Sequence, residues 1–280
     1  MSRQKWVKFG LIGVSGFILI FAGCAEGNEA GSATVTEDSG VSAAAVIARA
    51  CIKTTAVQSY RFQVRGASFQ GRVHISSIDK GEYLSPDQVR EEHTWARSGP
   101  STSMSLYYSE CIFIGRKEYS REFCSDWSDE ENEAKAGWRE SQTPEPVTLG
   151  GFLPGSLWCA DMLVQPMQLA DEEISGVGCW HYRGRMDMEK WLSKMHPEYE
   201  AWDSEEEKAY IEWYKKMDAT MELWIGRDDY LIRRMKVEQQ NTPAHAKRDV
   251  NIPLEEDVFI FFGISEYYDF NEPITIEPPK

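Results

Sequence analysis

Cysteine is the residue type in this sequence with the most informative chemistry. The chain of 280 residues contains six cysteines and five histidines. A cysteine thiolate can attack an electrophile, bind a metal ion or form a disulfide, depending on its surroundings. No Cys-x-x-Cys pair occurs and the histidines are scattered, so we expect no metal site and no other cofactor. Cys24 stands apart from the other cysteines because it ends an apolar segment at the amino terminus.

The segment that precedes Cys24 has the composition of a secretory signal. Arg3, Lys5 and Lys8 make its start positive, and residues 9–21 carry no charge and many large apolar side chains. A positive start, an apolar run of about a dozen residues and small residues before a cleavage point are typical of such a signal. The run is too short for a membrane-spanning helix, which needs about 20 residues. We therefore predict a signal peptide over residues 1–23.

The end of this segment, Phe21-Ala22-Gly23-Cys24, resembles the lipobox of bacterial lipoproteins. In that family the cysteine thiol receives a diacylglyceryl group, the chain is cleaved before it, and the new amine is usually acylated, for example with palmitate. The resemblance implies that Cys24 carries lipid and holds the protein at the cell membrane, on the extracytoplasmic side (cell surface or periplasm). Two or three acyl chains anchor a protein durably, at about 0.8 kcal/mol per buried methylene. The alternative is an ordinary secretory signal with an unmodified Cys24.

The five other cysteines would meet an oxidising compartment, where disulfides persist. Their odd number allows two disulfides and one free thiol, in several arrangements. We favour Cys111–Cys124 and Cys159–Cys179 because each pair closes a short loop. Cys51 falls in a helical pattern, where a small buried apolar residue is an equally good interpretation.

The charge of the chain excludes some partners. Removing residues 1–23 takes away three basic side chains and no acidic one, so 45 acidic and 27 basic side chains remain, a net charge of −18. Such a surface repels phosphate backbones, so we expect no nucleic acid partner. It also gains nothing electrostatically from an anionic membrane. Residues 24–40 are small and polar and predict a flexible tether before a domain over residues 41–280.

Apolar periodicity predicts one early helix and then mainly strands. Residues 42–56 have the helical period with Ser42 as the cap. Alternating patterns predict strands over residues 60–64, 72–78, 82–95, 103–114, 117–123, 172–176, 177–185, 220–226, 230–240 and 256–268. We expect a turn at residues 66–71, a loop over 128–151 and a short helix over 154–165. The apolar run over residues 258–262 predicts burial on both faces of the last strand.

A helical insert is predicted near residues 187–217, interrupted by Pro197. Several aromatic residues on its second half, together with Met217, can share one face. That face would either pack into the core or form a lid over an apolar opening.

Four segments of the chain resemble the LolA/LppX-like lipoprotein superfamily. They are residues 59–62 after the first helix, 110–119, 174–182, and 223–234 followed by 267–273. The resemblance implies an α+β fold in which a curved antiparallel sheet, an incomplete β-barrel, wraps around a few helices. It also implies an apolar cavity between sheet and helices that holds acyl chains. The acidity, the insert and the cysteines depart from the family pattern.

No catalytic motif is present, so we predict that the protein is not an enzyme. The sequence has no Gly-x-Ser-x-Gly, no His-Glu-x-x-His and no phosphate loop. We predict a membrane-anchored extracytoplasmic lipoprotein that binds a lipid or another hydrophobic ligand, with envelope lipid transfer as one use. The alternative is a non-catalytic interaction or envelope-sensing module with a filled core and an unidentified envelope protein partner. From inward alternation, the expected ligand-binding residues are Phe62, Val64, Val73, Ile75, Leu106, Ile112, Leu223, Ile225, Val237, Phe259 and Phe261.

Overall fold

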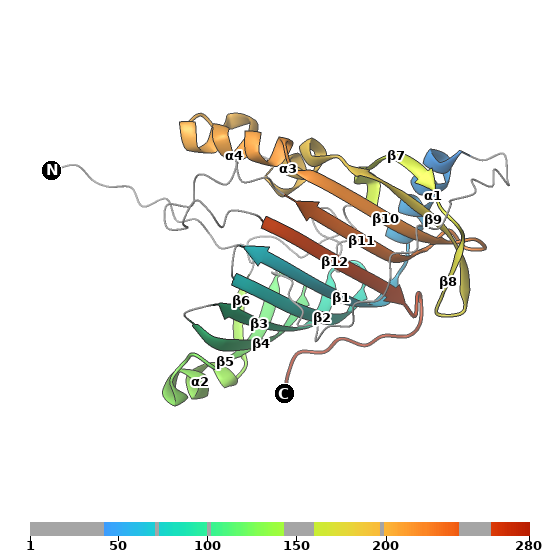
Figure 1. Ribbon diagram of the computed structural model, residues 1–280. Helices are drawn as coiled ribbons and strands as arrows, with labels where there is room; N and C mark the ends of the chain where they lie inside the picture. Colours follow the sequence, from blue (N-terminus) through green and yellow to red (C-terminus); the bar gives the residue numbers. More distant parts are fainter. Residues whose placement is uncertain (1–41, 71–72, 100–101, 143–159, 197–198, 241–258) are drawn as a thin grey trace.

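One antiparallel sheet organises the structure (Figure 1). The structure is a computed structural model, and it describes residues 42–70, 73–99, 102–142, 160–196, 199–240 and 259–280. Its strands are β1 (Ser59–Gln70), β2 (Val73–Leu84), β3 (Gln88–Gly99), β4 (Thr102–Ile114), β5 (Lys117–Cys124), β6 (Arg139–Gln142), β7 (Leu163–Gln168), β8 (Glu172–Ile174), β9 (Val177–Met186), β10 (Asp218–Gly226), β11 (Ile232–Gln240) and β12 (Phe259–Tyr268). The helices are α1 (Ala43–Thr55), α2 (Asp129–Ala136), α3 (Met188–Met195) and α4 (Glu205–Lys215), with a 3₁₀ turn over Tyr199–Ala201.

The first and last strands of the chain are neighbours in the sheet. The order is β6-β5-β4-β3-β2-β1-β12-β11-β10-β9-β7, and β8 pairs with β9. The last strand, β12, lies between β1 and β11, with Phe62 opposite Tyr267. The sheet is curved and leaves β6 and β7 as edges, so it is not closed into a barrel (Figure 1). The expected α+β fold with an incomplete antiparallel barrel is confirmed.

Helix α1 forms where its sequence predicts it. The Ser42 side chain accepts a hydrogen bond from the backbone N–H of Ala45 and caps the first turn. Val46, Ile47 and Ala50 recur on one side and are buried. We call the face of the sheet that packs against these residues the inner face.

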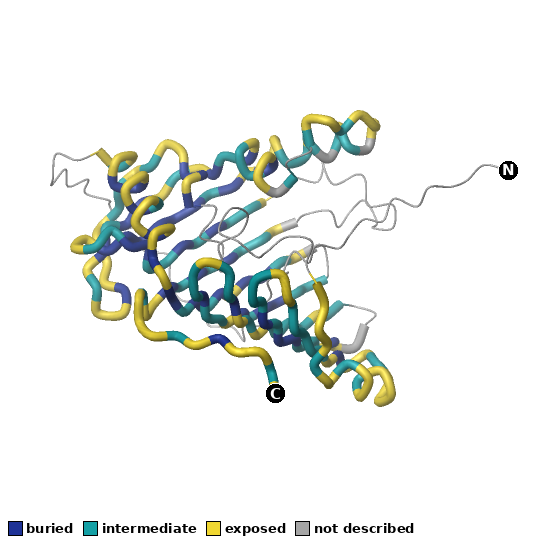
Figure 2. Tube along the Cα trace, turned by 180° about the vertical axis from the view of Figure 1, so that it is seen from behind, coloured by how far each residue is buried: buried dark blue, intermediate teal, exposed yellow. Residues whose placement is uncertain are grey.

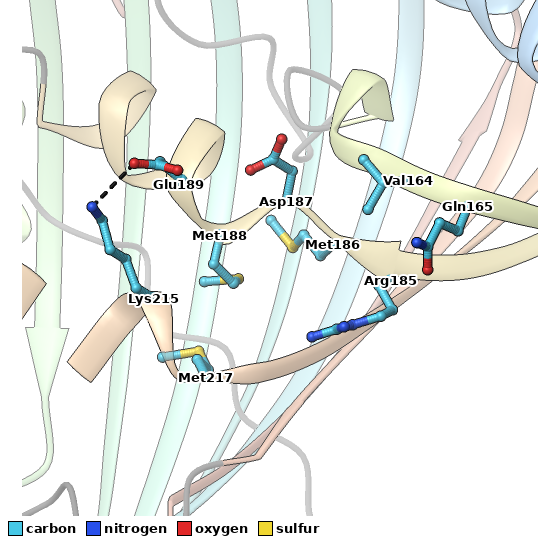
Figure 3. A pocket seen from close by; sticks show the side chains of 9 residues that line it. All are labelled: Val164, Gln165, Arg185, Met186, Asp187, Met188, Glu189, Lys215 and Met217. Carbon is cyan, nitrogen blue, oxygen red and sulfur yellow. Dashed lines mark ion pairs between the residues drawn. The ribbon is translucent and has the colours of Figure 1, made fainter. Parts of the chain in front are cut away.

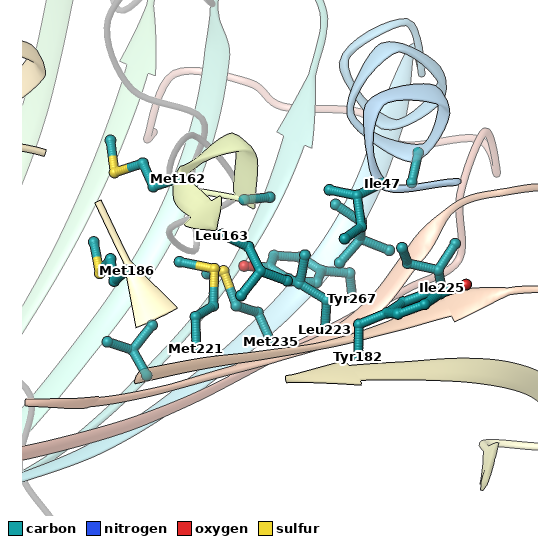
Figure 4. Packing of buried hydrophobic residues seen from close by; sticks show 14 of the residues in the cluster. Ile47, Met162, Leu163, Tyr182, Met186, Met221, Leu223, Ile225, Met235 and Tyr267 are labelled. Atoms are coloured by element: carbon teal, nitrogen blue, oxygen red, sulfur yellow. The ribbon is translucent and has the colours of Figure 1, made fainter. Parts of the chain in front are cut away.

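The core lies between α1 and the inner face of the strands around β10. Figure 4 shows Ile47 of α1 and Leu163 of β7 on one side of it, and Met221, Leu223 and Met235 of the sheet on the other. Buried residues gather on the strands beside α1, whereas α2 has no buried residue (Figure 2). The apolar area removed from water is therefore concentrated in one half of the sheet.

Two glycines allow close approaches within the sheet. A Cβ at Gly81 would collide with the ring of Phe62 and with the carbonyl oxygen of Arg90. A Cβ at Gly184 would collide with the backbone of β7 at Val164, where the pairing with β9 is irregular. Gly81 thus lets the Phe62 ring lie over β2.

Several sequence expectations about local structure are wrong. Strand β1 continues through Gly66 to Gln70, because these residues pair with β2 and β12. The expected loop after residue 128 contains α2, which a Ser128–Glu131 capping box starts, and β6. Leu163 to Gln165 are strand rather than helix, and residues 154–159 lie outside the described residues.

The apolar run near the start of β12 is not buried on both faces. Ile260 is 39% exposed, and Phe261 and Phe262 are half-buried. Phe261 packs against the core cluster whereas Ile260 points to the other face, so the run alternates between the two faces of the sheet. In the part of the chain that is described, no helix is long and apolar enough to cross a membrane.

Candidate functional site

The inner face of the sheet has an apolar half and a polar half. The apolar half comprises β1 and β9–β12 and forms the core with α1. The polar half comprises β2–β5, apart from Tyr83 and Val89, which belong to the core cluster. The register places Asp79 opposite His93, which is opposite Ser109, on the inner side of these strands.

Half of the expected ligand-binding residues belong to the packed core. Phe62, Val64, Leu223, Ile225 and Val237 are buried in one cluster, against which Phe261 packs. The same cluster includes Val46, Ile47 and Ala50 of α1, so these side chains form the sheet side of the core. Val73 and Ile75 lie on the inner side of β2 and are half-buried. The side chain of Phe259 lies outside the described set.

The expectation that Leu106 and Ile112 point inward is wrong. In β4 the inward positions are occupied by Tyr107, Ser109 and Cys111, because these pair with inward residues of β3. Leu106 therefore points outward and is 40% exposed. Successive residues of a strand point to opposite faces of the sheet. A pattern displaced by one residue therefore assigns every inward residue of that strand to the outer face.

The proposed disulfide between Cys111 and Cys124 is also wrong, since both are free thiols. Cys111 lies opposite Ser120, four residues from Cys124, which is about 13 Å along a strand. Cys179 is a buried free thiol that donates to the carbonyl oxygen of Val177, and its expected partner Cys159 is outside the described ranges. The short loop between Cys111 and Cys124, which favoured this pair, is a hairpin of β4 and β5.

Two of the described thiols, those of Cys51 and Cys111, are poor nucleophiles. Burial, with the charge of Asp161, raises the pKa of Cys51 to about 11. Burial and the surrounding carboxylates raise the pKa of Cys111 to about 12. Since the thiolate is the reactive form, neither position supports covalent catalysis. Nor does any group of three or more metal-binding side chains occur within the described ranges.

A pocket of about 300 Å³ opens at the edge of the apolar half (Figure 3). Three methionines from three elements line it: Met186 at the end of β9, Met188 at the start of α3 and Met217 before β10. All three are buried and belong to the core cluster. The remaining lining residues are Val164, Gln165, Arg185, Asp187, Glu189 and Lys215.

The helical insert forms one rim of this pocket. Trp191 of α3 stacks on Tyr214 of α4 at a ring separation of 4.7 Å, and both rings pack against the core cluster. Lys215 of α4 forms an ion pair with Glu189 of α3 (Figure 3). The aromatic face of the insert therefore packs on the core, and the insert also borders an opening.

The polar half of the inner face contains a group of side chains that the sequence patterns do not predict. Asp79, 2% exposed, forms an ion pair with His93. Burial raises the pKa of Asp79, although the hydrogen bond with His93 opposes this shift. Burial and the charge of Asp79 raise the pKa of Glu91 to about 7. Charged residues alternate on both sides of β3, so the sequence carries no signal of which ones point inward.

The outer face of the sheet is held by ion pairs. Glu110 lies between the guanidinium groups of Arg90 and Arg121. Burial opposes ionisation of Glu110, but the two arginines hold its pKa below the usual range. His181 lies between Glu172 and Glu222 in the same way on the other half. Glu110 and His181 are therefore each paired on two sides within the sheet.

No family model matches the chain, and no curated protein matches it. Among solved structures it is similar to LprF from Mycobacterium bovis, with 11% identity, coverage of 84% of this chain and 96% of that chain, and a TM-score of 0.47. It is similar to the lipoprotein LppX of Mycobacterium tuberculosis, with 10% identity, 84% and 97% coverage, and a TM-score of 0.43. A DUF1329 family protein from Desulfovibrio piger matches with 8% identity, 83% and 93% coverage, and a TM-score of 0.23.

Proposed function

We propose that this protein is a membrane-anchored extracytoplasmic lipoprotein that binds a lipid or another hydrophobic ligand on the concave side of its sheet. The observation that carries the proposal is the methionine-lined pocket of about 300 Å³ at the edge of the core. Its volume is at the lower end of the range of small-molecule sites. Met186, Met188 and Met217 are apolar but flexible, which suits a surface that adapts to an acyl chain.

The pocket combines three methionines with a charged rim, which suits a guest with an apolar part and a polar end. The three methionines are also core residues, so a ligand that displaced one of them would remain in contact with the core cluster. Each methylene that leaves water gains about 0.8 kcal/mol. The charged lining groups Arg185, Glu189 and Lys215 lie on exposed positions at the rim, where the polar end of a ligand can stay in water.

The anchor follows from the amino-terminal segment. We propose a signal peptide over residues 1–23, lipid on Cys24, and a tether over residues 24–40 before the domain. A flexible chain of this length spans about 20–25 Å, enough to keep the domain near one membrane while it exchanges lipid within the envelope. Replacing Cys24 with Ser and comparing membrane and soluble fractions tests the anchor. Unchanged retention in the membrane fraction would contradict it.

Ligand binding is tested by filling the pocket. Met188→Trp should reduce the displacement of a neutral apolar dye by long-chain alcohols at least tenfold, because the indole occupies the space. Met167→Trp is the matched control, since Met167 is 52% exposed on β7 and does not line the pocket. Mass spectrometry of protein extracted under native conditions should detect a co-purifying lipid. Absence of both lipid and dye displacement would overturn the proposal.

A second candidate function has one observation in its favour. Phe62, Leu223 and Ile225 are buried in the same core cluster as Val46, Ile47 and Ala50 of α1. A non-catalytic interaction or envelope-sensing module with a filled core would have this arrangement. Under this alternative, Met188→Trp and Met167→Trp would behave alike in the dye assay, and no lipid would co-purify.

A further inference from the structure

Exposed apolar side chains gather at one end of the outer face of the sheet. Phe69 of β1 is opposite Ile260 of β12, and these side chains are 42% and 39% exposed. On β4 and β5 the exposed members of the same face are Met104, Leu106 and Phe123. We call these five residues, together with half-buried Phe262, the apolar patch.

The strand register shows that the apolar patch is continuous across five strands. One row of opposite residues runs from β12 through β1, β2 and β3 to β4. It consists of Phe262, Ala67, Ser76, Ala96 and Leu106, and none of them carries a charge. The small residues in the middle of the row join the larger apolar side chains at its two ends into one surface.

The charges of these strands lie towards the other end of the outer face. Four residues further along β4, the corresponding row consists of Glu266, Gln63, Lys80, Glu92 and Glu110. The two charged residues that border the apolar patch are both paired, Arg65 with Glu266 and Glu238 with Lys236. The apolar patch therefore presents an uncharged surface, which does not complement a strongly charged partner.

The apolar patch and the methionine-lined pocket are at the same end of the sheet. Phe69 is near the end of β1, and Ile260 is near the start of β12. The pocket lies where β9 ends and β10 begins. Because neighbouring strands are antiparallel, all these strand ends lie on one side, beside α3 and α4 (Figure 1).

A lipid bilayer fits the apolar patch better than a second copy of the chain. Contiguous exposed apolar surface marks contacts with proteins or with membranes. The 17 residues between Cys24 and Ser42 span at most about 60 Å, so the proposed anchor keeps a bilayer within reach of the domain. Two mature copies, each with a net charge of −18, repel each other.

We propose that the apolar patch docks on the membrane surface and inserts its side chains among neutral lipids. This inference rests on the function proposed above and names the surface through which the ligand is exchanged. Apolar side chains of peripheral proteins enter the boundary between headgroups and acyl chains. Docking in this way brings the end of the sheet that carries the pocket to the bilayer, so a lipid has only a short path to it.

Photolabelling from within the bilayer tests the proposal. The full-length protein, purified from membranes, is reconstituted with vesicles of neutral phosphatidylcholine that contain a phosphatidylcholine with a diazirine on its acyl chain. Ile260 and Tyr268 form a matched pair, since both lie on the outer side of β12 and are 39% and 37% exposed. We expect at least fivefold more labelling at Ile260 than at Tyr268, which lies at the charged end.

A charge placed within the apolar patch should prevent docking. Leu106→Glu should lower the labelling of Ile260 several-fold, although the two residues are on different strands. Tyr268→Glu is the control and should leave this labelling unchanged. Both positions are exposed, and circular dichroism checks that both variants are folded.

Equal labelling of Ile260 and Tyr268, or unchanged labelling of Ile260 in Leu106→Glu, overturns the docking surface. A dimer that forms without lipid and is dissociated by Leu106→Glu also overturns it and assigns the apolar patch to a second copy. The dye assay with Met188→Trp does not involve these residues. The proposed function therefore stands or falls separately, on that assay and on the co-purified lipid.

Discussion

The Nζ atom of Lys215 lies 3.0 Å from Oε1 of Glu189 and joins α4 to α3 across the rim of the methionine pocket. The carboxylate raises the pKa of Lys215 through this contact. Both side chains are partly exposed, so water screens the pair and it contributes little to global stability. Its position, rather than its strength, makes it relevant to ligand entry.

We expect Lys215→Ala to lower the free energy of unfolding by less than about 1 kcal/mol and to accelerate dye uptake several-fold, because α3 and α4 can then separate more easily. Stopped-flow fluorescence measures the uptake, and urea denaturation measures the stability. Lys216→Ala is the control, since Lys216 pairs with Glu212 of its own helix. Equal uptake rates in the two variants would show that the interhelical pair does not restrain the opening.

The inner and outer assignment of the strands can be tested with two leucines. Leu223→Ala should lower the free energy of unfolding by about 2–5 kcal/mol, because it leaves a cavity in the core between α1 and β10. Leu106→Ala should cost less than about 1 kcal/mol, because Leu106 is on the outer face and 40% exposed. Urea denaturation of both variants gives the comparison. A large loss at Leu106 would contradict the register of β4.

Much of this fold could be predicted from the sequence, because its strands alternate clearly and its turns carry recognisable residues. Ser42 caps the first helix as expected, and the hairpins at Gly115 and at Ser175-Gly176 lie where positive φ angles are found at Gly115, Ser175 and Gly176. Helix α2 was not predicted because its residues are nearly all polar and none is buried, so it has no apolar period.

The candidate site was harder to predict. The methionine pocket brings together Val164, Met186 and Lys215, which lie on three separate elements, and their proximity depends on the pairing of β7 with β9 and of β9 with β10. The inward positions of Asp79, Glu91 and His93 depend on the phase of β2 and β3, whose charged residues occupy both faces. When neither face of a strand is uniformly apolar, the sequence does not show which of its residues point inward.

Glu222 connects three strands of the outer face. Its Oε2 accepts from Nε2 of buried His181 at 2.8 Å, and its Oε1 lies 3.3 Å from Nζ of Lys236. The hydrogen bond from His181 and the charge of Lys236 lower the pKa of Glu222, while burial opposes the shift. The carboxylate therefore contributes stability above the unfolded pKa of about 4.5, and this contribution is lost as the pH falls through the lower folded pKa.

Glu222→Ala should accordingly cost about 3 kcal/mol at pH 7, because it leaves His181 and Lys236 without their partner. The cost should shrink towards pH 3, where the wild-type carboxylate becomes protonated. Glu238→Ala removes the other partner of Lys236 from a more exposed position and should cost less than about 1 kcal/mol. Guanidinium denaturation at pH 7 and pH 3 separates the two. A cost at Glu222 that is independent of pH would point to packing instead.

Cys111 and Cys124 should remain reduced in protein purified from an oxidising compartment. Alkylation after unfolding without reductant, followed by mass spectrometry, should label both thiols, because their strand positions keep them apart. In the folded protein Cys111 should react far more slowly than a free thiol, since its pKa is about 12. Recovery of a Cys111–Cys124 disulfide peptide would require a different register of β4 and β5.

Glu91 should also make the stability of the ligand-free protein depend on pH. The folded pKa of Glu91, about 7, is above the ordinary glutamate value of 4.5. The folded state therefore favours the protonated form, and stability is lost as the pH rises from below 4.5 through 7. The titratable groups that face Glu91 are Tyr60 on β1, Asp79 on β2, His93 on β3 and Cys111 on β4.

Glu91→Gln removes the charge without changing the size of the side chain. Without ligand, this variant should exceed the wild type in free energy of unfolding by on the order of 2 kcal/mol at pH 8, and by much less at pH 5, where the wild-type carboxyl is already protonated. Glu92→Gln should show no such difference between the two pH values, because Glu92 is exposed on the outer face. Parallel stability curves for the two variants would mean that the Glu91 carboxyl is hydrated in the folded protein.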